Sequence, residues 1–366
     1  MRVPGPVKPQ GDHMDFGLNF FPVMEPGRKS ARDYYDETLR LSRLAEERGF
    51  EHVQTVEHYG SGYGGYSPDP VTLLTAVAAV TDRIRITTGA VIPAFTHPLK
   101  LAGKLAMLDN LSGGRLDVGF GRGFLPDEFD WFGVPMAESR ERFDEGIEAC
   151  RRLWSEENVV FSGKFSSFGP VTLQPRTVQQ PHPPIFVASA TSPESCAAAG
   201  TAGYHLQVVP SVTSREQLSE MLAAYREAWA AAGHAEGGAR IQIKYTCYVA
   251  EDGGHALALA ERFETNYIEQ MTGAIAAWAT TRSAAYPGYE GFIDKVKQYD
   301  FEKSLRQNKV FAGTPEAVAE QVATIGEWFG TDLCVSLQFS PGYQDFEDSH
   351  RALTLFADRV MPRFRH

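Results

Sequence analysis

The chain has 366 residues, of which 43% are hydrophobic and 22% are charged, and its formal net charge is −11. This length allows two average domains or one (β/α)8 barrel, and the composition is typical of a globular protein. The acidic balance argues against nucleic acid or an anionic membrane surface as the main partner. No apolar run approaches a membrane span, no signal peptide is indicated, and four cysteines without CxxC spacing indicate neither disulfides nor zinc, so we expect a cytoplasmic protein.

Along the chain, compact apolar runs of the buried parallel type alternate with helical segments. Residues 1–13 are rich in Pro and Gly and are predicted to form a disordered or tag-like tail. After Met14, strands are predicted at 15–21, 51–56, 84–92, 116–120, 185–188, 204–209, 240–250 and 333–339. Helices are predicted at 33–48, 68–80, 97–111, 137–154, 191–202, 214–232, 253–279 and 346–364, with another beginning at Thr314.

This alternation predicts a single (β/α)8 TIM barrel over residues 14–366. Two irregular segments, at about 155–183 and 280–308, are predicted to be insertions into the barrel. The second is aromatic, mixed in charge and interrupted at Pro287-Gly288. A connection of that length inside a compact domain is usually functional or mobile.

In such a barrel, the carboxyl ends of the strands are the first place to look for chemistry. His58 and its neighbour Glu57 follow the second predicted strand and precede a loop rich in Gly and Tyr. A histidine at this place can act as an acid or a base, because its ordinary pKa lies near neutral. The alternative is a hydrogen-bonded structural histidine.

The fourth strand runs into a glycine-rich corner in which Arg122 stands between Gly121 and Gly123. A guanidinium held there can clamp a phosphate, whereas the alternative is an ion pair with Asp127, Glu128 or Asp130. The corner does not meet the GxGxxG dinucleotide pattern.

Hydroxyl groups and a predicted helix N-terminus follow the fifth strand, at residues 188–195. Free backbone N–H groups at a helix N-terminus bind anions, so Arg122 and this turn together predict a two-sided phosphate clamp. An ordinary N-cap, with Pro193 at the first helical position, is the alternative and is compatible with the clamp. The histidines form no metal-binding pair, and we predict no metal site.

Taken in order, these strand ends resemble the bacterial luciferase-like flavin monooxygenases, and the luciferase α subunit in particular. The resemblance spans residues 14–365. Its matching segments are 17–21, 46–50, 56–59, 87–93, 97–98, 108–116, 121–123, 132–133, 138–140, 187–192, 312–316 and 360–362.

The resemblance implies a dimeric barrel that receives reduced FMN (FMNH2) from a separate NAD(P)H:flavin reductase. O2 would add to the flavin, and the resulting C4a-hydroperoxide would oxygenate a small organic substrate. His58 resembles the catalytic histidine, with Glu57 beside it, and segment 280–308 resembles a mobile active-site lid. The implied flavin-binding residues are Gly89, Ala90, Gly121, Arg122, Arg140, Ser189, Ala190, Thr191 and Ser192, with a non-prolyl cis peptide at Gly89-Ala90.

The sequence departs from the family pattern at three places. Gly121 replaces the reactive thiol of luciferase, Tyr59 replaces the second histidine, and the serine expected at the phosphate turn is displaced. Aromatic loop residues predict a flat aromatic or polyketide-like substrate, with Tyr59, Tyr63 and Trp131 as its candidate contacts. Two alternatives stay open: an F420-dependent oxidoreductase on the same barrel, and a non-catalytic flavin-binding protein.

Overall fold

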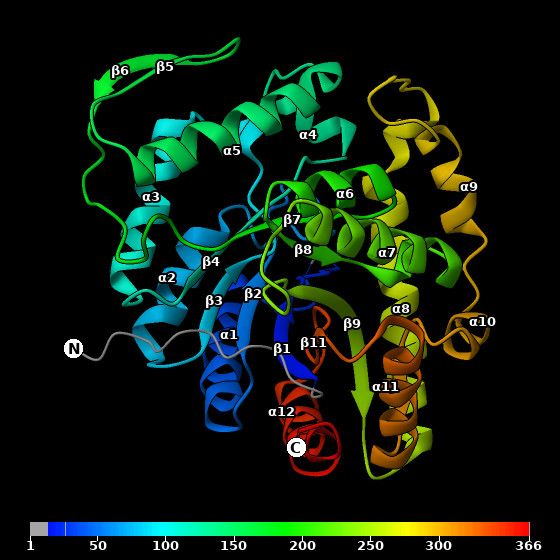
Figure 1. The fold of residues 1–366 in the computed structure, drawn as a ribbon. Helices are drawn as coiled ribbons and strands as arrows, with labels where there is room; N and C mark the ends of the chain where they lie inside the picture. Colours follow the sequence, from blue (N-terminus) through cyan, green and yellow to red (C-terminus); the bar gives the residue numbers. More distant parts are fainter. Residues whose placement is uncertain (1–13, 26, 366) are drawn as a thin grey trace.

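The computed structural model describes residues 14–25 and 27–365, so the predicted tail at 1–13 lies outside the described residues. Eight parallel strands close into a barrel, because β11 pairs with β1 and β8 pairs with β9 (Figure 1). In barrel order these strands are β1 Asp15–Phe20, β2 His52–Thr55, β3 Arg85–Thr88, β4 Leu116–Phe120, β7 Ile185–Ser189, β8 His205–Val208, β9 Ile241–Val249 and β11 Leu333–Gln338. All eight correspond to predicted strands, and the (β/α)8 prediction is confirmed.

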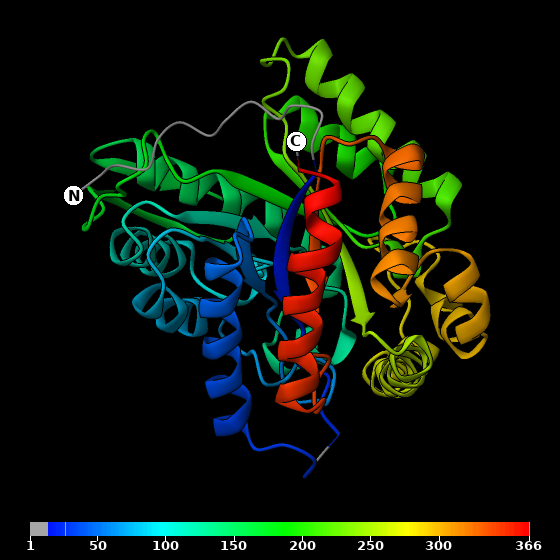
Figure 2. The same ribbon diagram turned by 90° about the horizontal axis from the view of Figure 1, so that it is seen from below.

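The helices cover the outside of the barrel, where Figure 2 shows α1 beside α12. The long helices are α1 Ala31–Glu47, α2 Pro70–Val80, α3 Pro98–Leu111, α5 Ser139–Ser155, α6 Pro193–Thr201, α7 Arg215–Ala231, α8 Gly253–Ala274, α11 Pro315–Phe329 and α12 Phe346–Leu355. Side chains of Ser30, Asp69 and Thr314 cap α1, α2 and α11 by accepting backbone N–H bonds. Apolar side chains on the inner helix faces pack against the strands in one large core.

Two predicted helices end earlier than expected. The chain after α8 continues as a 3-10 turn, Ala276–Ala279, and α12 passes into a π-helical turn, Phe356–Val360, and a 3-10 turn, Met361–Arg363. Four short elements escaped the sequence analysis: α4 Pro126–Trp131, α9 Phe292–Lys297, α10 Phe301–Arg306 and β10 Phe311–Gly313, which pairs with the end of β9. Further 3-10 turns are Pro93–Phe95, Met136–Glu138, Pro210–Val212 and Tyr289–Gly291.

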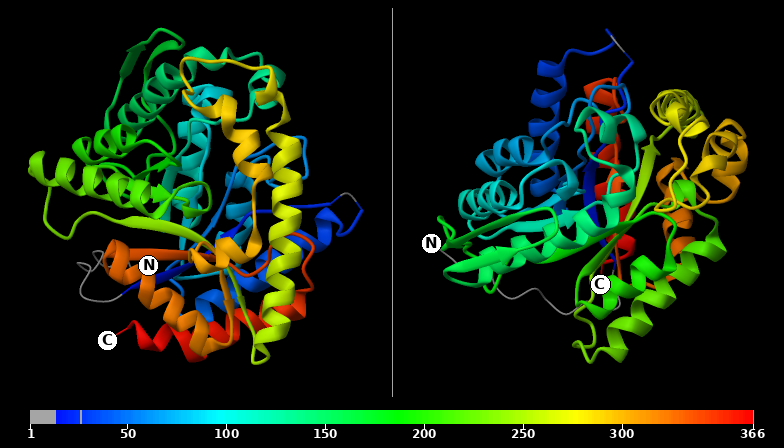
Figure 3. Two further views of the ribbon diagram at one scale, coloured as in Figure 1. Left: turned by 90° about the vertical axis from the view of Figure 1, so that its right-hand side faces the viewer. Right: turned by 90° about the horizontal axis from the view of Figure 1, so that it is seen from above.

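Both irregular segments lie outside the ring of strands. Segment 155–183 carries an antiparallel hairpin, β5 Val159–Ser162 with β6 Ser167–Val171, which extends away from the barrel. Segment 280–308 carries α9 and α10, which lie alongside α8 (Figure 3). Their interpretation as insertions into one domain stays a prediction.

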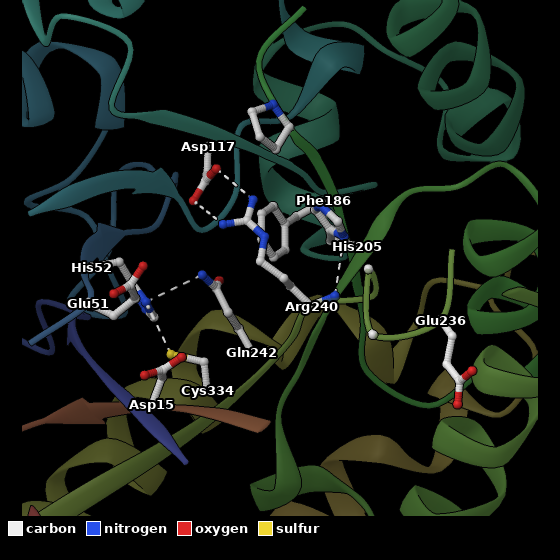
Figure 4. Close-up of a pocket in the computed structure, with 13 residues that line it drawn as sticks. Asp15, Glu51, His52, Asp117, Phe186, His205, Glu236, Arg240, Gln242 and Cys334 are labelled. Carbon is white, nitrogen blue, oxygen red and sulfur yellow. Dashed lines mark hydrogen bonds and ion pairs between the residues drawn. The ribbon is translucent and has the colours of Figure 1, made fainter. Parts of the chain in front are cut away.

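The amino ends of the strands are closed by a buried charge network (Figure 4). Asp117 accepts hydrogen bonds from Arg85 at 2.6 and 2.8 Å and from Arg240 at 2.8 and 3.1 Å. Burial alone would raise the pKa of Asp117, but the two arginines hold it well below its usual range. The cavity of about 290 Å³ at this end is lined in part by Asp117 and Arg240, whose charges neutralise one another. Features at this face of a TIM barrel usually serve stability, whereas chemistry occurs at the opposite face.

Candidate active site

A cavity of about 640 Å³ opens at the carboxyl ends of the barrel strands. Its walls come from the loops after β2, β3, β4 and β7, from α5, and from segment 280–308. Every residue predicted for catalysis or flavin binding lines it: Glu57, His58, Gly89, Ala90, Gly121, Arg122, Arg140, Ser189, Ala190, Thr191 and Ser192. Residues from separate parts of the chain therefore meet in one space.

One end of the cavity is strongly basic. The Ser192 hydroxyl caps α6 by accepting the Ser195 N–H at 3.1 Å, and Arg140 donates to the Ser195 hydroxyl at 2.8 Å. Burial lowers the pKa of Arg140, and so does the nearby positive charge of Arg122. Within the described residues neither arginine forms an ion pair, so the alternative pairing of Arg122 with the carboxylates of α4 is not observed. Two cations beside a helix N-terminus make a site for an anion, even with the Asp144 carboxylate nearby.

Tyr286, from segment 280–308, covers this basic end. The Arg122 guanidinium carbon lies 3.9 Å from the centre of the Tyr286 ring, which is the geometry of a cation–π contact. The Tyr286 hydroxyl donates to the Gly123 carbonyl at 2.7 Å. The segment is thus attached to the glycine-rich corner that presents Arg122.

His58 is held by a residue that the sequence analysis did not assign to it. Nδ1 of His58 lies 3.0 Å from Oε1 of Glu128, whose side chain is only 1% exposed. The same oxygen accepts the Tyr59 N–H at 2.9 Å, while Oε2 of Glu128 has no partner among the described residues. This carboxylate fixes the ring of His58 at the cavity wall. The sequence analysis considered Glu128 only as a partner of Arg122.

Glu57 also lines the cavity, but its hydrogen bonds go elsewhere than to His58. Its carboxyl accepts the Tyr59 hydroxyl at 2.8 Å and the Ile92 N–H at 3.0 Å. Burial raises the pKa of Glu57 to about 7, although both hydrogen bonds oppose that shift. A carboxyl group with such a pKa can exchange a proton near neutral pH.

The floor of the cavity contains a lysine that the sequence analysis also missed. Lys244, on β9, donates to the carbonyl of Gly89 at 2.7 Å, and burial lowers the pKa of Lys244 to about 7. The peptide bond between Gly89 and Ala90 is cis, as the family resemblance implied. A Cβ atom on Gly89 would lie 2.3 Å from Oε1 of Gln54, so a larger residue there would displace that side chain. The one signal for Lys244 in the sequence is a charged residue inside an otherwise apolar strand.

The three predicted substrate contacts do not line this cavity. The Tyr59 hydroxyl binds Glu57, as described, and Trp131 is 57% exposed. Tyr63 is buried behind His58, with 5.2 Å between the ring centres, and its hydroxyl lies 3.2 Å from that of Tyr267. The side chains that do extend the lining beyond the predicted set include Phe124, Phe143, Tyr286 and Tyr289.

Other classes of site receive no support from the part of the chain that the structure describes. There, no cluster of three His, Cys, Asp or Glu side chains is arranged to hold a metal ion. All four cysteines are buried and unpaired. Over residues 14–25 and 27–365, no helix has the length and apolar character needed to cross a membrane.

Comparisons with known proteins agree with this geometry. Residues 14–332 match the family model described as luciferase-like monooxygenase. The structure is similar to that of monooxygenase RslO1 from Streptomyces bottropensis, with 48% identity, a TM-score of 0.87, and coverage of 96% of this chain and 100% of that chain. The sequence is 29% identical to the oxygenase component of a flavin-dependent trigonelline monooxygenase from Acinetobacter baylyi, over 92% of both chains. It is 28% identical to an FMNH2-dependent dimethylsulfone monooxygenase from Pseudomonas putida, over 90% of this chain and 88% of that one.

Proposed function

This chain belongs to the luciferase-like monooxygenases, and we propose that it is the FMNH2-dependent oxygenase component of a two-component system. A separate NAD(P)H:flavin reductase would supply the reduced cofactor, and one atom of O2 would enter a small organic substrate while the other leaves as water. The observation that carries the proposal is that the basic end of the cavity and His58 face one enclosed space. The relatives named as FMNH2-dependent or flavin-dependent oxygenases support the cofactor and the two-component organisation.

The residues present fit the phosphate of FMN. Arg122 is close enough to Arg140 to lower its pKa, and neither arginine forms an ion pair within the described residues, although the charge of Asp144 acts on both. A phosphate placed between them and the N-terminus of α6 would remove this repulsion. Arg122, Arg140 and the turn 189–192 would therefore hold the phosphate.

The residues of the floor and wall of this cavity fit the flavin ring system of FMN. Gly89 and Ala90 line the cavity without large side chains, and the amide oxygens of Gln54 and Gln207 are buried without a partner among the described residues. Lys244 supplies a donor and a titratable charge beside them. When bound, reduced FMN supplies the two electrons with which O2 is activated.

His58 would carry the proton transfers that this reaction needs. Because Nδ1 is bound to Glu128, Nε2 is the atom left to accept or donate a proton. Tyr286 and Tyr289 close the cavity from the side of segment 280–308 and would exclude water, which is the role proposed for the lid.

The test is anaerobic mixing of the protein with FMNH2, followed by exposure to O2 and a panel of small organic compounds in the presence of a flavin reductase. We expect tight binding of FMNH2, a changed rate of its oxidation by O2, and product that contains one atom of supplied 18O2. A protein that neither binds FMNH2 nor changes its oxidation would contradict the proposal. Tighter binding of reduced F420 than of FMNH2 would instead favour the deazaflavin alternative.

A further inference from the structure

A second cavity, of about 600 Å³, lies beside the barrel mouth. It is enclosed by the start of α7, by α8, and by α9 and α10 of segment 280–308, which Figure 3 shows along α8. We call it the lateral cavity. Apolar and aromatic side chains form one part of its wall: Val212, Tyr267, Ile268, Met271, Phe292 and Val296. Its volume is in the range of sites that bind small organic molecules.

The rest of its wall is polar and includes four cations, although the whole chain carries a net charge of −11. Arg215, Lys295, Lys303 and Lys309 line it, and none of them forms an ion pair with any described residue. Burial lowers the pKa of Lys309, and the positive charge of Lys303 lowers it further. These two lysines repel one another at the wall, and an anion bound between them would be stabilised.

The carboxyl groups of the same wall are already engaged. Asp300 caps α10 by accepting the Lys303 N–H at 2.6 Å. Glu216 lies at the start of α7, where its own N–H and the Ser214 hydroxyl lower its pKa. Glu264 is buried, which raises its pKa, and it accepts the Tyr248 hydroxyl at 3.0 Å. These three carboxyl groups make their hydrogen bonds elsewhere, so the four cations of the wall keep no carboxylate in an ion pair among the described residues.

We propose that the lateral cavity binds an aromatic organic anion, with its ring against Met271 and Phe292 and its acidic group at Lys303 and Lys309. The tyrosine hydroxyl of Tyr299 is buried there without a partner among the described residues and would donate to the same acidic group. This site lies outside the catalytic cavity and does not depend on the flavin reaction.

An aromatic wall separates the two cavities. Phe292 faces the lateral cavity, Phe124 faces the catalytic one, and their ring centres are 6.5 Å apart. A substrate that crosses this wall toward His58 and an effector that stays outside it would have the same chemistry at this site. Kinetics distinguish a substrate from an effector. Removal of the cations would raise the KM of a substrate that enters through the lateral cavity, but it would not change the KM of a substrate that enters elsewhere.

The test uses the fluorescent probe 1-anilinonaphthalene-8-sulfonate and its uncharged analogue N-phenyl-1-naphthylamine. We expect the sulfonate to bind the wild-type chain and its Kd to rise about tenfold or more in Lys303→Gln/Lys309→Gln, because a charged contact is lost. Lys297→Gln is the matched control, since Lys297 is exposed on α9 and does not line the cavity. The uncharged analogue should not distinguish these variants.

Arg122→Ala separates the two cavities in the same assay. An unchanged Kd of the sulfonate in this variant supports the lateral site, whereas a rise would place the probe in the catalytic cavity and overturn the proposal. An unchanged Kd in Lys303→Gln/Lys309→Gln would also overturn it. Because Lys303 is exposed, the single variant Lys303→Gln keeps the test valid if the double variant does not fold.

Discussion

His58 and Glu128 are 70 residues apart in sequence, yet Nδ1 of His58 lies 3.0 Å from Oε1 of Glu128. Glu128 belongs to α4, which begins directly after the glycine-rich corner that presents Arg122. One short stretch of chain therefore supplies both Arg122 at the basic end of the cavity and the carboxylate that holds His58. If FMN binds as proposed, this stretch couples the position of His58 to the position of the cofactor.

Replacing either member of this pair should reduce turnover without loss of flavin. We expect His58→Ala to retain FMN binding and lose product formation, since a general acid or base contributes roughly 10²–10⁴-fold. Glu128→Gln should lower kcat by about 10- to 100-fold, because the ring stays in place with a weaker partner. Steady-state product formation and the Kd of FMN are the measurements, and Asp130→Asn, exposed on the same helix, is the control. A Glu128→Gln variant with normal kcat would remove Glu128 from this role.

Removing a cation from the basic end should act on flavin affinity. Loss of one charged phosphate contact in Arg122→Ala is expected to cost about 1.5–3 kcal/mol, which is about 10- to 150-fold in Kd. The comparison variant is Arg142→Ala, because Arg142 pairs with Glu138 away from the cavity at 2.8 Å. Both variants are titrated with FMN. Equal Kd values for FMN in the two variants would show that Arg122 does not contact the phosphate.

The expected homodimer also has a testable surface. Met107 and Leu111 are 54% and 60% exposed and lie one turn apart on α3. We propose that this exposed apolar pair belongs to the dimer interface, because the family resemblance implies a dimer. We expect the wild-type chain to be a dimer and Met107→Glu/Leu111→Lys to be a monomer by size-exclusion chromatography with light scattering. Leu257→Glu, on α8, should stay dimeric.

The barrel was predictable because its strands are largely buried, and several of them, such as β1 and β7, appear as short, largely apolar runs. Strand β10 has only three residues and gives no such pattern. Helix α4 is six residues long and begins at Pro126, so its periodicity is too short to recognise. Segment 155–183 was predicted as irregular, although it contains the antiparallel pair β5 and β6.

The candidate site was predictable where chemistry follows a strand end. Arg122 and the turn after β7 have local signals, in flanking glycines and in an N-cap. The contact between Glu128 and His58 has no local signal in the sequence, because it depends on where α4 places the Glu128 side chain relative to the loop that carries His58. Lys244 was overlooked for a related reason: strand periodicity shows that it lies in β9 but not that its amino group reaches Gly89.

Glu57 should make stability depend on pH. Burial raises its pKa from 4.5 to about 7 in the folded chain, so its contribution to stability is complete below pH 4.5 and is lost as the pH rises through 7. Relative to Glu57→Gln, which stays uncharged, the wild-type chain should lose up to about 3 kcal/mol of unfolding free energy between pH 5 and pH 8. Urea unfolding at both pH values measures this, with Glu47→Gln, exposed on α1, as the control. Parallel curves for the wild type and Glu57→Gln would show that the carboxyl group titrates normally.

Lys244 should make stability depend on pH in the opposite direction to Glu57. Burial lowers its pKa from 10.5 to about 7, so the unfolded chain holds a proton that the folded chain releases, and stability rises between these values. Lys244→Met should therefore be more stable than the wild type at pH 6, by up to about 5 kcal/mol, and this advantage should shrink toward pH 10. Lys100→Met, exposed on α3, should show no such trend.

The same variant tests why a lysine would be retained at a place where it destabilises the fold. If Lys244 faces the anionic reduced flavin, its removal should weaken the binding of FMNH2 more than that of oxidised FMN, since only the reduced ring carries a charge for the lysine to neutralise. The ratio of the two dissociation constants is the measurement, and it does not depend on turnover. A ratio that is unchanged in Lys244→Met, together with the expected gain in stability, would show that Lys244 acts only through its hydrogen bond to Gly89.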